Sequence, residues 1–264
     1  MAGNTSDPRR SAAHRVLSVL TAFQRGGVSL SLSEVAEHAQ LPLSTTHRLV
    51  GELVEWGLVT RTGHGRYQLG LRVWEMGQQV GQRLRETARP FVHELRRLTG
   101  ETSQLAIRAG REVLYIERAY APHRVPRASR VGGRLPLNTT AVGKVILAHE
   151  PLEVQEELLS TPFPAVTERT VTDPERLRGQ LQHIREQGHC ITVEEIRLGA
   201  CSIAVPVFHR GRVGAALGLV VSSERAMTLT RHLPALTQMS SQIEAATRAI
   251  PLETLWQASA EPHD

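Results

Sequence analysis

The chain has 264 residues, enough for about two domains, and its hydrophobic fraction of 41% can supply a core. The longest run of apolar and glycine residues, 213–221, is too short to cross a bilayer, and the first ten residues lack the apolar segment of a secretory signal. Two cysteines cannot form a disulfide framework, so we expect a cytoplasmic protein that makes no membrane contact.

The charge is basic and unevenly composed. A net charge of +5 suits a nucleic-acid partner without establishing one. Arginine supplies all but one of the 31 basic residues, which a bias toward arginine codons explains, and Lys144 is the exception. The histidines and cysteines show no HExxH or CxxC spacing, so we expect neither a metal site nor another cofactor.

The N-terminal part of the chain predicts a helix–turn–helix. An apolar stripe in residues 12–23 predicts a first helix, and apolar residues at helical spacing predict a second helix over 32–39. After a short break, Ser44 can cap a third helix that runs to about Trp56 and ends at Gly57. The inner face of this third helix is predicted to be apolar and to comprise Leu49, Val50, Leu53 and Val54.

The third helix and the segment after it carry side chains suited to DNA. Small and hydrogen-bonding residues lie outside at the start of the helix, where a recognition helix meets base edges. A strand–turn–strand pattern over 58–70 predicts a β-hairpin with basic flanks, as in a DNA-contacting wing. The alternative is a plain helical hairpin followed by a β-turn of no function. The predicted DNA-binding residues are Ser44, Thr45, Thr46, His47 and Arg48 on the helix, and Arg61, His64 and Arg66 on the wing.

Residues 71–85 predict a linker helix that could pair with a second copy of itself. Its apolar positions follow helical spacing and are Val73, Met76, Val80 and Leu84. Residues 87–90 allow a break before Pro90, and a further helix over 91–98 opens the second domain.

The second domain mixes strands and helices. Strands are predicted over 105–109, 113–119, 190–193, 202–207 and 213–220, and helices over 140–148, 152–159, 173–187 and 228–250. Residues 122–136 are rich in Pro, Gly and Arg and predict a loop. Antiparallel hairpins with helices before and after them favour an α+β sensor domain over a Rossmann unit.

The stretch LPLNTTAVGKVILA, residues 135–148, is the most distinctive one outside the predicted DNA unit. Asn138 or Thr139 can cap the helix that follows. The free amides of Thr140, Ala141 and Val142 would then favour a carboxylate or another anion. The alternative is an ordinary capped helix with a face of small residues, and the GxxxxGK[ST] phosphate loop is absent.

The stretch TVEEIRLGACSIAVPV contains a candidate nucleophile, Cys201. A cysteine nucleophile needs a paired histidine, and His189 is the nearest in sequence, but a buried inert cysteine is favoured. Glu194 and Glu195 could form an acid pair, but we favour a solvated turn. Because the sequence assembles no nucleophile and base, we expect no catalytic residues and no enzyme.

Three segments, in matching order and at matching separations, resemble the isocitrate-lyase-regulator (IclR) family of bacterial transcription regulators. They are LSEVAEHAQLPLSTTHRLVGELVEWGLV, RVGGRLPLNTTAVGKVILA and EEIRLGACSIAVPV. The resemblance covers nearly the whole chain. It implies an N-terminal winged helix–turn–helix, a linker helix and a C-terminal domain similar to GAF and PAS sensors. It also implies dimers that often pair into tetramers, binding to promoter DNA, and small-molecule effectors that are often carboxylates or aromatics.

The same resemblance implies a set of effector-binding positions. They are Ala141, Val142, Thr192, Ser202, Gly218 and Val220. An acid often found at the Thr192 position is absent here, and a cysteine often found at the Ser202 position is replaced by serine. Two strand hydroxyls of some carboxylate-binding members correspond to Gly218 and Val220, although serines at 222–223 lie close by. These departures predict a roomier, less polar wall and an acid larger or more apolar than a small keto acid.

We therefore expect a homo-oligomeric, sequence-specific DNA-binding transcription regulator, a dimer or dimer of dimers on double-stranded promoter DNA. An organic or aromatic acid is expected to change its operator affinity. The expected organisation is a disordered tail at 1–9, a winged helix–turn–helix at 10–72, a linker helix at 73–90, an effector-binding and oligomerisation domain at 91–250, and a C-terminal tail at 251–264. Two rivals remain open: an enzyme that modifies a ligand in the second domain, and a DNA architectural protein that needs no ligand.

Overall fold

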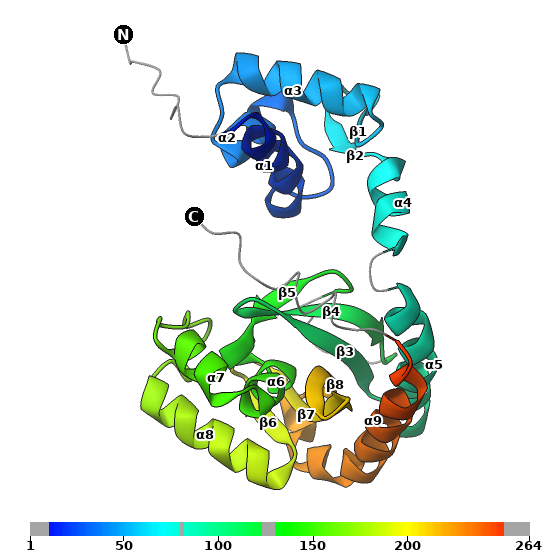
Figure 1. Ribbon diagram of the computed structural model, residues 1–264, viewed down its shortest axis with the longest axis vertical. Helices are drawn as coiled ribbons and strands as arrows, with labels where there is room; N and C mark the ends of the chain where they lie inside the picture. Colours follow the sequence, from blue (N-terminus) through cyan, green and yellow to red (C-terminus); the bar gives the residue numbers. More distant parts are fainter. Residues whose placement is uncertain (1–10, 80–81, 123–129, 251–264) are drawn as a thin grey trace. The chain divides into compact units, whose positions relative to one another are not determined.

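The computed structural model describes residues 11–79, 82–122 and 130–250 (Figure 1). The predicted tails at 1–9 and 251–264 lie outside the described residues. The chain divides between residues 80 and 81 into two compact units, which are described separately below.

The first unit is a winged helix–turn–helix followed by one more helix. Its elements are α1 (Ala12–Arg25), α2 (Leu32–Ala39), α3 (Leu43–Glu55), β1 (Val59–Arg61), β2 (Tyr67–Leu69) and α4 (Leu71–Gln79). Ser31 and Glu34 form a capping box at the start of α2, which satisfies two backbone amides there. The core is apolar and draws on all three first helices and the hairpin; it includes Val19, Phe23, Val35, Leu49, Leu53 and Val59. Strands β1 and β2 pair antiparallel, and Leu30 extends the pairing through a bridge to Tyr67.

Helix α3 differs from its prediction in three places. It begins at Leu43 after Pro42, with no side-chain cap, so Ser44 lies inside the first turn and does not cap it. The prediction that Thr46 contacts DNA is wrong, because its side chain is fully buried and donates to the Pro42 carbonyl. Val54 was predicted to be internal but is 37% exposed.

The predicted linker helix is also different. Helix α4 ends at Gln79, and α5 (Gln82–Thr99) runs through Pro90, where a break was predicted. Proline removes one helical hydrogen bond, but the buried side chains of α5 lie on both sides of it, so packing holds the helix together. These buried side chains are Leu84, Ala88, Val92 and Leu95. Leu84 therefore cannot join a pairing stripe with Val73 and Met76, and Val80 lies outside the described residues.

The second unit is built on a six-stranded antiparallel sheet in the order β5-β4-β3-β8-β7-β6. The strands are β3 (Thr102–Ala109), β4 (Glu112–Ala119), β5 (Arg134–Pro136), β6 (Cys190–Val193), β7 (Ala200–His209) and β8 (Arg212–Ser222). The two predicted hairpins, β3–β4 and β7–β8, are confirmed. Strand β5 falls within 122–136, which was predicted to be loop throughout; residues 123–129 lie outside the described part of the chain.

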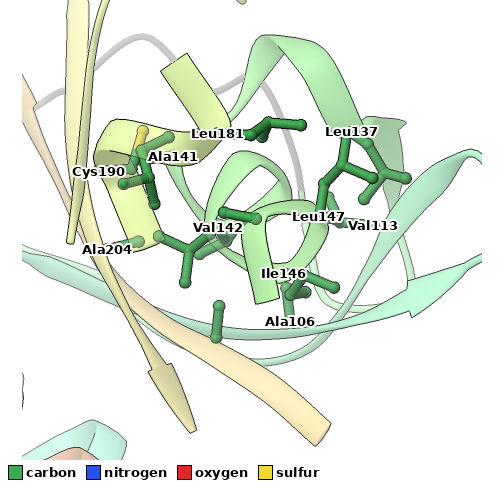
Figure 2. Close-up of a cluster of buried hydrophobic side chains, with 14 of the residues drawn as sticks. Ala106, Val113, Leu137, Ala141, Val142, Ile146, Leu147, Leu181, Cys190 and Ala204 are labelled. Atoms are coloured by element: carbon green, nitrogen blue, oxygen red, sulfur yellow. The ribbon is translucent and has the colours of Figure 1, made fainter. Parts of the chain in front are cut away.

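Helices cover both faces of this sheet (Figure 1). One face packs on α6 (Ala141–His149), α7 (Leu152–Leu159) and α8 (Pro174–Gln187), which follow the short 3-10 turn η1 (Leu137–Thr139). The other face packs on α5 and α9 (Leu233–Thr247), preceded by η2 (Ser223–His232). The predicted helix over 228–250 is therefore a 3-10 segment followed by an α-helix. The α+β class is confirmed, and α6 lies buried at the centre of one layer (Figure 2).

No helix among the described residues is long and apolar enough to cross a membrane.

Candidate functional site

The exposed side of α3 presents a polar surface at the start of the helix. Ser44, His47 and Arg48 are exposed and Thr45 is half-buried, whereas Thr46 points into the core. Arg48 forms an ion pair with Glu52 one turn later, and both side chains remain more than half exposed. Exposed pairs of this kind contribute little stability, so the guanidinium can exchange its partner for another anion or for a base edge.

The hairpin β1–β2 and its connecting turn are called the wing here. The wing carries two exposed basic residues and a third that makes hydrogen bonds to the start of α2 and the residues before it. Arg61 and His64 are exposed on the wing. Arg66 instead donates to the Ser29 carbonyl (2.8 Å) and to the Glu34 carboxylate (2.7 Å). The pKa of Glu34 is lowered, first by the Ser31 backbone amide and also by Arg66. Arg66 therefore ties the wing to the start of α2, which does not fit its predicted role at the DNA-facing tip.

A small hollow with a cavity volume of about 30 Å³ lies in the second unit between β3, β4, β7, β8 and the start of α6; we call it the pocket. Its polar lining is Gln104, Tyr115, Arg118, Thr140 and Ser202, and its large apolar lining is Leu135, Ile196 and Val220. Thr140, Ser202 and Val220 lie near or at positions predicted from the sequence, and Leu135 and Ile196 lie within stretches that the sequence singled out. The remaining residues, Gln104, Tyr115 and Arg118, come from strands that no motif singled out.

The start of α6 is capped one residue later than predicted. The Thr140 hydroxyl accepts from the Gly143 amide (3.0 Å), so Thr140 is the cap rather than Asn138 or Thr139. Asn138 donates to the Val171 carbonyl instead, and Thr139 donates to the Pro136 carbonyl. The amides of the next two residues, 141 and 142, occupy the first helical positions, which have no partner within a helix. Their side chains pack in the core beside Ala204 (Figure 2).

The strand wall opposite α6 holds a neutral hydroxyl pair. Thr192 and Ser202 face each other across β6 and β7, with their hydroxyl oxygens 2.7 Å apart. Ser202 in turn lies opposite Val220, and both line the pocket.

The prediction that Gly218 adds space to the pocket is wrong. A Cβ atom at this position would lie 3.0 Å from the Val142 Cγ1 atom and 3.0 Å from the Ile203 carbonyl oxygen. The volume that glycine leaves on β8 is therefore occupied by Val142 on α6. Glycine here permits close packing of the helix on the sheet.

Two polar residues of β4 line the pocket, and sequence reasoning missed both. Tyr115 is buried, which raises the pKa of its phenol to about 12, so the neutral group remains a hydrogen-bond partner of Thr140. Arg118 is buried as well, and its guanidinium lies 5.3 Å from the ring centroids of both Tyr115 and Tyr120. The one available signal was the pair of charged residues, Glu117 and Arg118, in the otherwise largely apolar stretch VLYIERA.

The interpretation of Glu194 and Glu195 as a solvated turn is also wrong. Glu195 is buried against Lys144, and Glu194 accepts from the Gly199 amide. Burial raises the pKa of Cys190 to about 12 and also raises that of Cys201. Both thiols therefore stay protonated, which does not suit a nucleophile. Among the described residues, no group of three or more His, Cys, Asp or Glu could hold a metal ion.

An N-terminal winged helix–turn–helix and a C-terminal α+β unit with a basic pocket define a helix–turn–helix transcription regulator. The chain belongs to the IclR family. Residues 12–63 match the IclR helix-turn-helix domain, and residues 78–249 match the C-terminal domain of bacterial IclR transcriptional regulators.

Curated relatives are transcription regulators. The chain is 32% identical to the HTH-type transcriptional regulator KipR of Bacillus subtilis, over 80% of this chain and 85% of KipR. It is 30% identical to the Pca regulon regulatory protein of Pseudomonas putida, over 90% and 85% of the two chains. The relatives and the family to which the chain belongs are transcription regulators rather than enzymes.

A solved structure gives a close match of the fold. It is an IclR homolog from Microbacterium hydrocarbonoxydans complexed with 4-hydroxybenzoate, with a TM-score of 0.84 and 36% identity, over 90% of this chain and all of that one. The IclR structure from Thermotoga maritima has a TM-score of 0.71 and 27% identity, over 88% and 97%.

Proposed function

We propose that the protein binds a specific operator through α3 and the wing, and that an organic acid in the pocket changes its operator affinity. The observation that carries this proposal is the buried guanidinium of Arg118 beside an apolar wall. Tyr115 and Cys201 are neutral, so Arg118 is the one formal charge among the residues that line the pocket. A buried guanidinium suits an anionic ligand, because its hydrogen bonds to a carboxylate are charge-assisted and stronger than those between neutral groups.

The rest of the lining favours an acid with an aromatic or alkyl body. The carboxylate would lie between Arg118 and the start of α6, where helix amides and the helix dipole also favour an anion. Leu135, Ile196 and Val220 would contact the body of the ligand. The hydroxyl of Ser202 could bond a polar group at the far end. The complex of the Microbacterium homolog with 4-hydroxybenzoate supports an aromatic acid as the first probe.

For DNA, the proposed groove contacts are the exposed and half-exposed residues at the start of α3. They are Ser44, Thr45, His47 and Arg48. Arg61 and His64 on the wing would contact phosphates, which fix position without reading sequence.

We also propose that the active species is at least a dimer that reads two half-sites. A single winged unit offers few base contacts, and family regulators of this design gain specificity by symmetry. Helix α4 exposes three large apolar side chains that a second copy could cover: Leu71, Trp74 and Met76.

Calorimetric titration with and without operator DNA tests the proposal. The operator would first be mapped by footprinting the region upstream of the protein's own coding sequence. Aromatic acids such as 4-hydroxybenzoate are expected to bind once per chain, and operator DNA must change their affinity by the same factor by which they change operator affinity. Binding of pyruvate-sized keto acids alone would refute the ligand class. Absence of any saturable binding would favour a DNA architectural protein.

A further inference from the structure

Lys144, the one lysine of the chain, is almost completely buried on α6 and makes a full set of hydrogen bonds. Its ammonium donates to both carboxylate oxygens of Glu195 (2.7 and 2.6 Å) and to the Gln180 side-chain oxygen of α8 (2.9 Å). An ammonium has three donors, so the three acceptors saturate it. The second oxygen of Glu195 also accepts from the Val171 amide.

Burying such an ion pair in a core has a high cost in free energy. Removing charges from water carries a large penalty, and apolar residues of similar volume often serve stability as well or better. All the remaining Lys or Arg positions of the chain are arginine, whereas this site holds the compact ammonium of a lysine. The ion pair of this ammonium with Glu195 is buried. Its geometry therefore points to something other than bulk stability.

Glu195 belongs to the connection between β6 and β7, residues 194–199, which we call the 194–199 loop. The loop is held from several sides: the Thr170 hydroxyl donates to the Glu195 carbonyl (2.7 Å), and the Thr167 hydroxyl donates to the Glu194 carbonyl (2.8 Å). Glu194 adopts a φ of +58°, a left-handed conformation that a residue with a side chain keeps only where its surroundings enforce it.

The 194–199 loop leads directly into the pocket. Ile196 lines the pocket next to Glu195, and the loop continues into Ala200, Cys201 and Ser202, which line it as well. On the opposite side, Lys144 lies one helical turn after Thr140, the cap that contacts Tyr115. The ion pair thus links α6 to the 194–199 loop, and neither of its two residues lines the pocket itself.

Resting on the effector function proposed above, we propose that Lys144 and Glu195 are positioning residues for the pocket. They contact no ligand. They fix the 194–199 loop against α6, and through Ile196 they set the shape of the wall that the body of the ligand meets. Stability and ligand affinity should therefore respond differently when the pair is replaced by apolar residues.

The test compares three variants with the wild-type protein: Lys144→Met, the double variant Lys144→Met/Glu195→Met, and Arg178→Met. The last is a matched control, because Arg178 is also a cation in ion pairs with two glutamates but lies at the surface of α8. Thermal unfolding, hydrogen exchange of the 194–199 loop and calorimetric titration with 4-hydroxybenzoate are measured on each.

Lys144→Met alone leaves the buried carboxylate of Glu195 without its cation and is expected to lower the melting temperature. The double variant should recover most of that loss, so it provides a folded protein for the other two measurements. In this double variant, amides of the 194–199 loop are expected to exchange at least about tenfold faster, and 4-hydroxybenzoate to bind about five- to tenfold more weakly. Arg178→Met should leave exchange and affinity as in the wild type.

A double variant with wild-type loop exchange, or with wild-type affinity, would overturn the positioning role and leave the pair a structural feature. Failure of the wild-type protein to bind 4-hydroxybenzoate would be a different result. It would count against the ligand class proposed above, and loop exchange in the double variant would then decide the positioning role alone.

Discussion

Replacing Arg118 by methionine should remove the preference of the pocket for an acid over its neutral ester. Methionine keeps most of the length of the side chain and its apolar contacts while deleting the charge. A hydrogen bond to a charged group contributes about 1.5–3 kcal/mol, so affinity for 4-hydroxybenzoate should fall roughly 10- to 150-fold. The methyl ester of the same compound has no carboxylate and should bind the two proteins about equally.

The variant should still fold. Arg118 lies over the rings of Tyr115 and Tyr120, and each such contact contributes about 0.5–1 kcal/mol. A loss of about 1–2 kcal/mol lowers the melting temperature of a unit of this size by roughly 2–8 °C. Calorimetry at 25 °C would therefore compare two folded proteins.

Val220→Ala is the matched control, because Val220 lines the same pocket without charge. It should weaken the acid and the ester by a similar factor, leaving their ratio as in the wild type. If Arg118→Met instead keeps the wild-type ratio of acid to ester affinity, the carboxylate lies elsewhere and the reasoning from the buried guanidinium fails.

Four further outcomes are expected in the DNA-binding unit. Arg48→Ala should cost about 1–3 kcal/mol on a cognate operator and relax specificity locally, measured by titration against operator variants. Arg66→Ala should lower the melting temperature of the first unit and weaken binding to all sequences alike, because it breaks the tie between the wing and α2; unchanged melting would contradict this. Gly70→Ala should destabilise by about 2–4 kcal/mol in urea unfolding, since a Cβ there would lie 2.1 Å from the Gly57 carbonyl oxygen. Light scattering at micromolar concentration should give at least twice the chain mass of 29.1 kDa, and Trp74→Glu on α4 should reduce it; a wild-type monomer would refute the pairing role of α4.

The elements that the sequence predicted well are those with a local cause. Apolar spacing and turn residues fix α2, α3 and the two long hairpins of the second unit, because each forms from contacts a few residues apart. The prediction failed where distant packing decides. Pro90 signals a helix end locally, yet α5 continues through it because its apolar face packs along the sheet. Thr46 looks like a groove residue by composition, but its rotational position on α3 places it in the core.

For the pocket too, the sequence predicted some residues and missed those whose role depends on distant parts of the chain. Ser202 and Val220 were found through the family resemblance, and both line it. Arg118 was not found, because nothing local says which buried arginine of a strand faces a cavity. Glu195 was misread because its partner is 51 residues away in the sequence, so that an acidic turn and half of a buried ion pair look alike.

The close approach of Val142 to Gly218 shows that the residues of one wall do not determine the size of a pocket. A glycine on β8 suggests spare volume only if the facing helix stays unchanged, and here Val142 occupies that volume. The charge of a lining residue is a more reliable guide to the ligand class, because a change in the packing of neighbouring side chains does not remove it. Strand β6 carries no acidic residue, and the Thr192–Ser202 pair contributes two neutral hydroxyls. The proposed preference of the pocket for an anion therefore rests on two features together: a cation buried on β4 and the absence of an acidic residue from β6.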